Sequence, residues 1–172
     1  MRNIMNRWLL AGIVSLVAVA QASASIVFNF NTVWTGGTPS GPAPWATMTI
    51  SDIAGGVQIS LTNSPTNTAG QFISKLNLLF NTLPTGSNSV GDPYVQSVSL
   101  GSYTDAGLSF NVSVRFKTRP SDRMLPGNTS TFELFGVSTS DFAGLDNSAM
   151  VHIQNIPPLG TQARLSRLSQ AA

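Results

Sequence analysis

The chain has 172 residues, of which nine are Lys or Arg, seven are Asp or Glu, one is histidine and none is cysteine. The absence of cysteine excludes a disulfide scaffold, thiolate zinc sites and cysteine nucleophiles, and the single histidine excludes most histidine-based metal sites. With 42% hydrophobic residues and a formal net charge of +2, the composition is typical of one folded domain rather than of a disordered chain.

The first 24 residues have the three regions of a secretory signal peptide. A polar start with Arg2 and Arg7 precedes an apolar stretch over residues 8–20, which is too short for a transmembrane helix. Small residues then stand at the positions that signal peptidase reads, so we expect cleavage between Ala24 and Ser25 and export through the Sec pathway. The mature chain would have no stable membrane span. An uncleaved N-terminal anchor is the alternative.

Removing this segment changes the charge of the chain. Seven basic and seven acidic residues remain, so the mature chain is formally neutral. Four of the basic residues lie close together in the sequence, with Asp122 among them: Arg115, Lys117, Arg119 and Arg123. We interpret them as solvated charges at a strand end and in a loop rather than as a polyanion site. No basic patch that would bind nucleic acid is expected.

Residues 25–172 have the composition and periodicity of strands. Nearly a third of them are Ser, Thr or Asn, which favour turns and the wet faces of sheets over helix interiors. Polar and apolar residues alternate strictly over 57–62 and 108–117, as in strands with one dry face and one wet face. Six further strands are expected, over residues 26–33, 45–53, 72–80, 94–100, 131–137 and 150–156.

The predicted fold is all-β: an antiparallel β-sandwich or jelly-roll-like domain of about eight strands over residues 25–156. Turn-forming clusters of Gly, Pro, Asn and Asp separate the strands, and 53–57 has the pattern of a hairpin. One short helical turn is expected over 140–145, capped by Thr139 or Ser140. Seven phenylalanines are expected in the core: Phe28, Phe30, Phe72, Phe80, Phe110, Phe116 and Phe132.

The last segment of the chain has a different pattern. Two prolines at 157–158 end the final predicted strand. Residues 157–172 are expected to form a loosely ordered tail, in which 162–170 could form a short, weak helix.

Few residues suggest catalysis. His152 lies between Val151 and Ile153, and this alternation predicts that it faces away from the core as a polar surface residue. The sequence has no nucleophile elbow and no phosphate-binding loop. A glycoside hydrolase with paired carboxylates would have to use acids that mostly lie in predicted turns: Asp52, Asp92, Asp105, Asp122, Glu133, Asp141 and Asp146. We therefore expect no enzymatic activity, with such a hydrolase as the less favoured alternative.

Two kinds of binding site are considered. Asp141, Asp146 and Asn147 form the densest group of oxygen donors and would suit calcium, although a helical turn capped by these side chains is the favoured interpretation. No other cofactor is expected. Trp34 and Trp45 flank a segment rich in Gly and Pro, and exposed tryptophans at the rim of a sandwich can stack on sugar rings. Alternatively, Trp45 closes the edge of the core.

Three segments together resemble a known group of proteins. They are residues 29–31 with the segment from Trp34 to Trp45, residues 52–59 with their Gly-Gly turn, and the late segment 149–156 (AMVHIQNI). Together they resemble the secreted PEP-CTERM sorting-domain proteins of Gram-negative bacteria, over most of residues 25–156.

This resemblance implies a secreted β-rich domain and supplies no catalytic residues. Members of the group end in a Pro-Glu-Pro motif, a hydrophobic helix and a basic cluster. Here residues 157–160 are PPLG and no apolar helix follows. The resemblance therefore implies secretion but not processing by an exosortase.

We conclude from the sequence that the protein is a secreted, non-enzymatic β-sandwich of the cell surface or extracellular matrix with a structural or interaction role; the periplasm is the other location considered. The alternative is a carbohydrate-binding module that stacks sugars on Trp34 and Trp45, and a hydrolase that uses loop Asp residues ranks last. The expected partners are an extracellular polysaccharide or other surface proteins.

Overall fold

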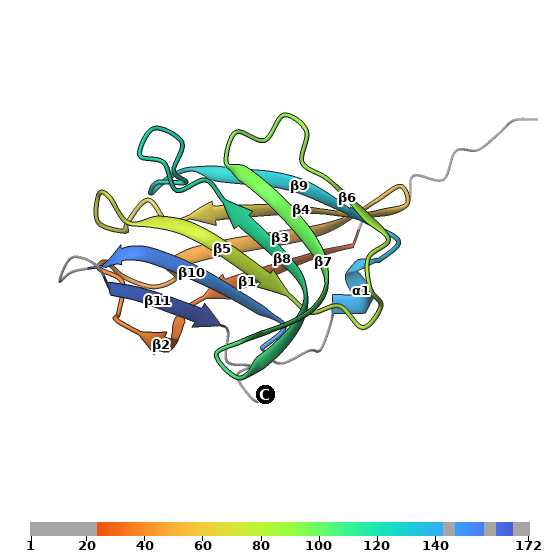
Figure 1. The fold of residues 1–172 in the computed structure, drawn as a ribbon, viewed down its shortest axis with the longest axis horizontal. Coiled ribbons are helices and arrows are strands. Elements are labelled where there is room, and N and C mark those ends of the chain that lie inside the picture. Colours follow the sequence, from red (N-terminus) through yellow and green to blue (C-terminus); the bar gives the residue numbers. More distant parts are fainter. Residues whose placement is uncertain (1–23, 143–146, 157–160, 167–172) are drawn as a thin grey trace, which may run out of the picture.

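The computed structural model describes residues 24–142, 147–156 and 161–166. In these residues the chain forms two antiparallel sheets, of five and six strands, that pack face to face as a β-sandwich with one short helical turn (Figure 1). The predicted all-β sandwich is confirmed. No helix in this part of the chain is long and apolar enough to cross a membrane.

The five-stranded sheet has the order β1-β3-β4-β9-β6. Its strands are β1 (Ser25–Phe30), β3 (Ala46–Ile53), β4 (Gly56–Asn63), β9 (Thr129–Phe135) and β6 (Gly86–Asn88). The hairpin expected at 53–57 joins β3 to β4, with Ile53 opposite Gly56. On the outer face, hydroxyl groups pair across neighbouring strands, as Thr62 and Thr129 do at 2.8 Å.

The six-stranded sheet has the order β2-β11-β10-β5-β8-β7. Its strands are β2 (Thr32–Gly36), β11 (Thr161–Ser166), β10 (Ala149–Ile156), β5 (Phe72–Leu78), β8 (Leu108–Phe116) and β7 (Val95–Asp105). The two central strands, β10 and β5, have partners on both sides. A central strand leaves little of its backbone exposed, and long neighbouring side chains can also cover its outer face.

The core lies between the two sheets and takes the inward-facing residue of each alternating strand. Met48, Ile50 and Ile59 enter it from the five-stranded sheet, and Leu76 and Val114 enter it from the other. The seven phenylalanines expected in the core are all buried. Alternation therefore identified the residues that face inward in most strands.

The single strand predicted over 26–33 is wrong. The chain breaks at the exposed Asn31 and forms β1 and β2, which belong to different sheets. Phe28 and Phe30 are buried in the core from one sheet, and Val33 packs against it from the other. The apolar pattern continues through the crossing, so periodicity alone could not reveal it.

The helix predicted over 162–170 is also wrong where the structure describes this segment. Strand β11 lies between β10 and β2 and pairs with both. Ala163 and Leu165 are fully buried whereas Gln162 is exposed, which is the period-two pattern of a strand. The sandwich therefore continues past residue 156 to Ser166; residues 157–160 and 167–172 lie outside the described residues.

Candidate functional site

His152 is buried, not exposed as the sequence predicted. It does face away from the core, because Val151 and Ile153 on either side of it belong to the core. However, only 6% of the residue is exposed. Strand β10 lies between β11 and β5, and the strand register places Arg164 and Lys75 directly beside His152.

The tip of the β7–β8 hairpin bends toward this buried histidine. Strand β7 has one more residue than β8 between the pairs Leu100–Val112 and Tyr103–Phe110, and such a bulge bends a hairpin. The turn itself is the two residues Ala106 and Gly107, both with positive φ (49° and 83°), as two-residue hairpin turns require. Local backbone geometry thus directs the hairpin tip over the outer face of the sheet.

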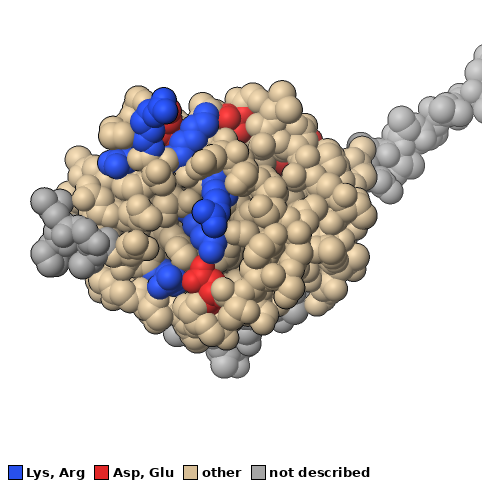
Figure 2. Space-filling model, viewed as in Figure 1, with Lys and Arg blue, Asp and Glu red and all other residues tan. Residues whose placement is uncertain are grey.

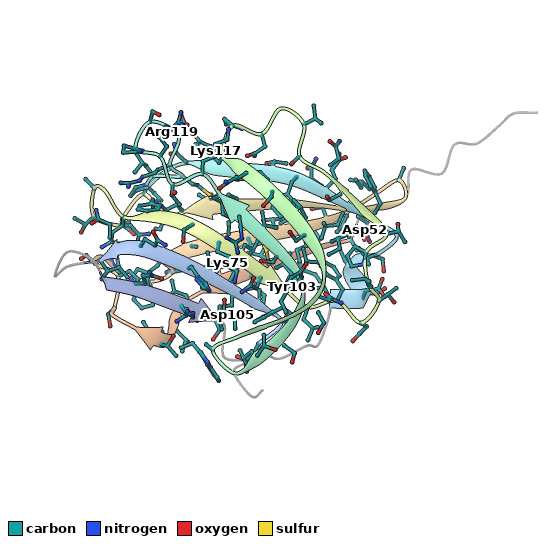
Figure 3. All side chains as sticks on the ribbon, viewed as in Figure 1. Asp52, Lys75, Tyr103, Asp105, Lys117 and Arg119 are labelled. Atoms are coloured by element: carbon teal, nitrogen blue, oxygen red, sulfur yellow. The ribbon has the colours of Figure 1, made fainter. Side chains whose placement is uncertain are left out.

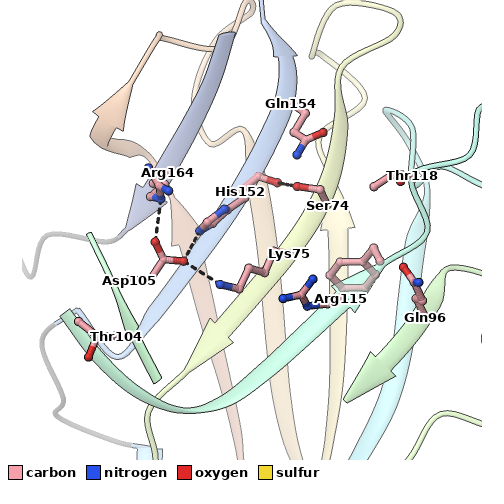
Figure 4. A pocket seen from close by; sticks show the side chains of 11 residues that line it. Ser74, Lys75, Gln96, Thr104, Asp105, Arg115, Thr118, His152, Gln154 and Arg164 are labelled. Carbon is pink, nitrogen blue, oxygen red and sulfur yellow. Dashed lines mark hydrogen bonds and ion pairs between the residues drawn. The ribbon is translucent and has the colours of Figure 1, made fainter. Parts of the chain in front are cut away.

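Asp105, at this tip, contacts side chains from three strands (Figure 4). Its Oδ2 atom accepts hydrogen bonds from Nζ of Lys75 and Nδ2 of Asn77, both at 2.9 Å. The same oxygen lies 2.8 Å from Nε2 of His152. Its Oδ1 atom lies 2.8 Å from Nε of Arg164, which completes a network of polar contacts across β5, β10 and β11, with ion pairs to Lys75 and Arg164.

A further hydrogen bond holds the tip at the edge of the sheet. Nε1 of Trp34, on β2, donates to the carbonyl oxygen of Ala106 at 3.1 Å. Trp34 is an extra residue between the pairs Thr35–Arg164 and Val33–Leu165, and a bulge can redirect a side chain in this way. The hairpin tip therefore has contacts with β5, β10, β11 and β2.

The environment sets the protonation of the two buried groups. Burial alone would raise the pKa of Asp105, but the hydrogen bond and charge of Lys75, together with His152, lower that pKa below its ordinary value. Burial lowers the pKa of His152 to about 4, with Lys75 and Arg164 acting in the same direction and the Asp105 carboxylate opposing them. Near pH 7 the imidazole is therefore neutral and Asp105 is ionised.

A polar cleft of about 460 Å³ adjoins this network (Figure 4). It is lined by Ser74, Lys75, Gln96, Thr104, Asp105, Arg115, Phe116, Thr118, His152, Gln154 and Arg164. Three of these residues are cationic at neutral pH and only Asp105 is anionic, so the lining carries a net positive charge.

Arg115 is the cation of this cleft whose side chain has no hydrogen-bond or ion-pair partner among the described residues. Across β5 and β8 it lies directly opposite Lys75, and like charges in directly opposed positions destabilise a strand pair. Asp105 offsets Lys75 but also contacts Arg164. The guanidinium of Arg115 is therefore not neutralised by any described acidic side chain. The protein therefore leaves positive charge in the cleft without a counter-charge.

The cations extend beyond the cleft along the same face. Figure 2 shows Lys and Arg side chains in groups that form a broken band across the molecule, with acidic side chains beside it at both ends, and Figure 3 places Lys117 and Arg119 at one end of this band and Lys75 near its centre. In contrast, the five strands of the opposite sheet contain no Lys or Arg and carry Asp52 and Glu133. The nearly neutral domain thus has one cationic face.

Part of the basic segment 115–123 fits the structural interpretation made from the sequence. Lys117 donates from Nζ to the Pro93 carbonyl at 2.7 Å. Arg123 donates from Nε to the Thr118 carbonyl, and its guanidinium lies 4.2 Å from the centre of the Phe72 ring. Arg115 and Arg119 have no such contacts in the part of the chain described here.

The two tryptophans proposed for sugar stacking lie in different environments. Trp45 is 9% exposed, belongs to the core, and donates from Nε1 to the Gly41 carbonyl at 2.9 Å. Trp34 is 37% exposed, and its ring lies beside the tip of the hairpin. Of the pair, therefore, only Trp34 presents a substantial ring surface to a ligand.

Asp141, proposed for calcium, is engaged in capping the helical turn α1 (Thr139–Phe142). Its Oδ2 accepts hydrogen bonds from the backbone nitrogen and the hydroxyl of Ser138, both at 2.8 Å, and Oδ1 accepts one from Thr82. The cap residue is thus Ser138 rather than Thr139 or Ser140, and the hydrogen bond that its backbone nitrogen donates to the Asp141 carboxylate is one half of a capping box.

The proposed calcium group has two further members, Asn147 and Asp146. Asn147 adopts a positive φ of 55°, and Asp146 lies outside the described residues. In the described part of the chain, no group of three or more His, Cys, Asp and Glu is placed to hold a metal ion.

The carboxylates that line a second pocket, of about 420 Å³, have structural hydrogen bonds. Asp52 accepts from the backbone nitrogen and the hydroxyl of Thr139, at 2.7 and 2.9 Å. Hydrogen bonds from Ser138 lower the pKa of Asp141, whereas the general acid of a glycoside hydrolase needs a raised pKa. Asp141 therefore does not have the electrostatics of the general acid in such a dyad.

Comparison with protein-family models finds no match, and comparisons with curated proteins and with solved structures find none either. The predicted signal peptide lies almost wholly in residues 1–23, outside the described residues. Ser25, the residue expected after cleavage, is the first residue of β1.

Proposed function

We propose that the mature chain is an exported, non-catalytic interaction domain that binds an acidic polysaccharide of the cell surface or extracellular matrix. Binding would use the cationic face, by which we mean Lys75, Arg115, Lys117, Arg119 and Arg164. The proposal depends on one observation: these cations share one side of a domain whose opposite sheet has no Lys or Arg.

Charge segregation of this kind supports binding to a polymer more than it supports catalysis. A formally neutral domain has no strong overall attraction for anions, so binding would depend on the local field over one face. An extended polyanion can contact several cations along such a band at once. A row of cations therefore matches the regularly spaced negative charges of such a polymer.

The predicted export favours a polysaccharide over a nucleic acid as the anionic polymer. The N-terminal segment has the pattern of a signal peptide, and the resemblance to PEP-CTERM proteins implies the cell surface or extracellular matrix. Exported chains meet acidic polysaccharides there. The proposal therefore keeps the interaction role expected from the sequence and moves the binding residues away from Trp45, which is buried.

The test is retention of the mature chain on immobilised polygalacturonate, with dextran as the neutral matched surface. We expect retention on polygalacturonate alone, and we expect it to fall as NaCl rises from about 0.05 M to about 0.5 M, because salt screens exposed charges. A Lys117→Gln/Arg119→Gln double variant should elute at lower salt. Glu133→Gln, on the opposite sheet, is the control and should behave as the wild type.

Three results would contradict the proposal. One is equal retention on dextran, which would mean that charge is not recognised. Another is the absence of retention on either surface at low salt. The third is equally strong retention on double-stranded DNA, which would indicate a general affinity for polyanions rather than a polysaccharide ligand.

A further inference from the structure

We infer that the cleft is a subsite for one carboxylated sugar unit, with the carboxylate of a hexuronate held between Arg115 and Lys75. The inference deepens the proposed function and rests on it. It assigns a ligand position to residues that the sequence places on separate strands: Lys75 on β5, Arg115 on β8 and Arg164 on β11.

The positive charge of Arg115 and Lys75 in the cleft is only partly balanced. Arg115 and Lys75 lie directly opposite each other, and of these two cations Asp105 contacts Lys75. The planar Arg115 side chain has five N–H donors, and within the described ranges none is used in a hydrogen bond or ion pair. A carboxylate beside Arg115 would fit the paired donors of a guanidinium and relieve the repulsion between the two cations.

The cations of the cleft already hold one carboxylate, that of Asp105. Asp105 lies in the side of the cleft formed by Lys75, His152 and Arg164, with contacts of 2.8 to 2.9 Å. This carboxylate is nearly buried, and its side chain is 8% exposed. The donors on this side of the cleft are therefore already arranged around the two oxygens of a carboxylate.

The remaining side chains that line the cleft suit the hydroxyl groups of a sugar. Ser74, Gln96, Thr118 and Gln154 present hydroxyl and amide groups to the cleft. These groups both donate and accept hydrogen bonds, as sugar hydroxyls do. The volume of about 460 Å³ lies within the range of ligand pockets, roughly 300–1,000 Å³. A neighbouring unit of the polymer would continue along the band of cations.

The experiment compares calorimetric binding of tri-galacturonate and of its fully methyl-esterified form to the mature chain. Esterification converts each carboxylate into an uncharged methyl ester and leaves the sugar rings and their hydroxyl groups unchanged, so we expect only the acid to bind. Arg115→Gln should weaken binding of the acid about tenfold, the usual effect of losing one charged hydrogen bond. Arg115→Lys should retain part of the affinity. Arg123→Gln, which changes a cation outside both the cleft and the cationic face, should change binding of the short oligomer less than twofold.

The outcomes separate the subsite from the proposed function. Equal weakening by Arg115→Gln and Arg123→Gln, with polygalacturonate still retained, would overturn the subsite and leave the function standing. Equal binding of the acid and the ester would also overturn the subsite. If neither the trimer nor the polymer binds, both proposals fail. Thermal melting of each variant checks the fold, and an unchanged melting temperature assigns lost affinity to the cleft.

Discussion

The burial of His152 predicts a specific dependence of stability on pH. An unfolded histidine has a pKa near its ordinary value of 6.5, whereas burial lowers the pKa in the folded protein to about 4. Between these two values the unfolded chain binds one more proton than the folded chain. The free energy of unfolding must therefore fall as the pH falls through this window.

The magnitude follows from the difference between the two pKa values. Each pKa unit is worth about 1.4 kcal/mol, so lowering the pH from about 7 to about 5 should remove about 2 kcal/mol of stability. For a chain of this size that loss corresponds to a melting temperature about 4–8 °C lower. The Asp105 carboxyl adds little in this window, because its pKa in the folded protein lies below its ordinary value of 3.8.

The assay is urea unfolding of the mature chain at closely spaced pH values, with a His152→Gln variant measured in parallel. The wild type should lose stability steadily below about pH 6.5, and the variant should lose much less over the same range because its side chain does not titrate. The slopes are compared rather than the absolute stabilities, since the substitution itself can change packing. Parallel slopes would refute a buried, neutral histidine, and so would a wild type whose stability rises on acidification.

Four further substitutions test the packing of the site and of its surroundings. Asp105→Asn removes the anion that two cations and His152 surround, and we expect it to lower the free energy of unfolding in urea by about 2–3 kcal/mol. This is less than the loss of a fully buried ion pair, because Lys75 and Arg164 are partly exposed. Unchanged stability would mean that the network is not maintained in solution. Trp45→Ala should lower the free energy of unfolding by about 3–5 kcal/mol because it leaves a cavity in the core, whereas Trp34→Ala should lower it by about 1 kcal/mol or less. Equal losses of stability would contradict the different burial of the two rings. Leu165→Ala should cost about 2–5 kcal/mol if β11 is part of the sandwich, and a loss within about 0.5 kcal/mol would restore the predicted loose tail.

Much of the fold could be predicted from the sequence because one face of most strands enters the core. The segment 108–116 alternates strictly, and β8 occupies almost the range expected for it. Strand β6 was not expected, because three residues, Gly86–Asn88, are too few to show a period. The separation of β1 from β2 was also missed, since the apolar pattern does not stop where the chain changes sheets.

The candidate site could not be predicted, because its residues are neighbours only across strands. Asp105 meets Lys75 from 30 positions away in the sequence, and a contact between them requires the bulge in β7 to bend the hairpin over the sheet. Alternation correctly predicted which way His152 faces, but not that neighbouring side chains would cover it. One signal was available: in a chain with 9% charged residues, any charged residue within a predicted strand is unusual.

The segment that sequence reasoning treated as a tail supplies part of the candidate site. Strand β11 fills the space between β10 and β2, contributes Ala163 and Leu165 to the core, and brings Arg164 to Asp105. A chain ended at residue 156 would lose this cation and leave two strand edges unpaired in the middle of a sheet, where exposed backbone favours aggregation. Weak binding by such a fragment would reflect the loss of β11 as much as the chemistry of the cleft. Binding and stability must therefore be measured on chains that include residues 161–166.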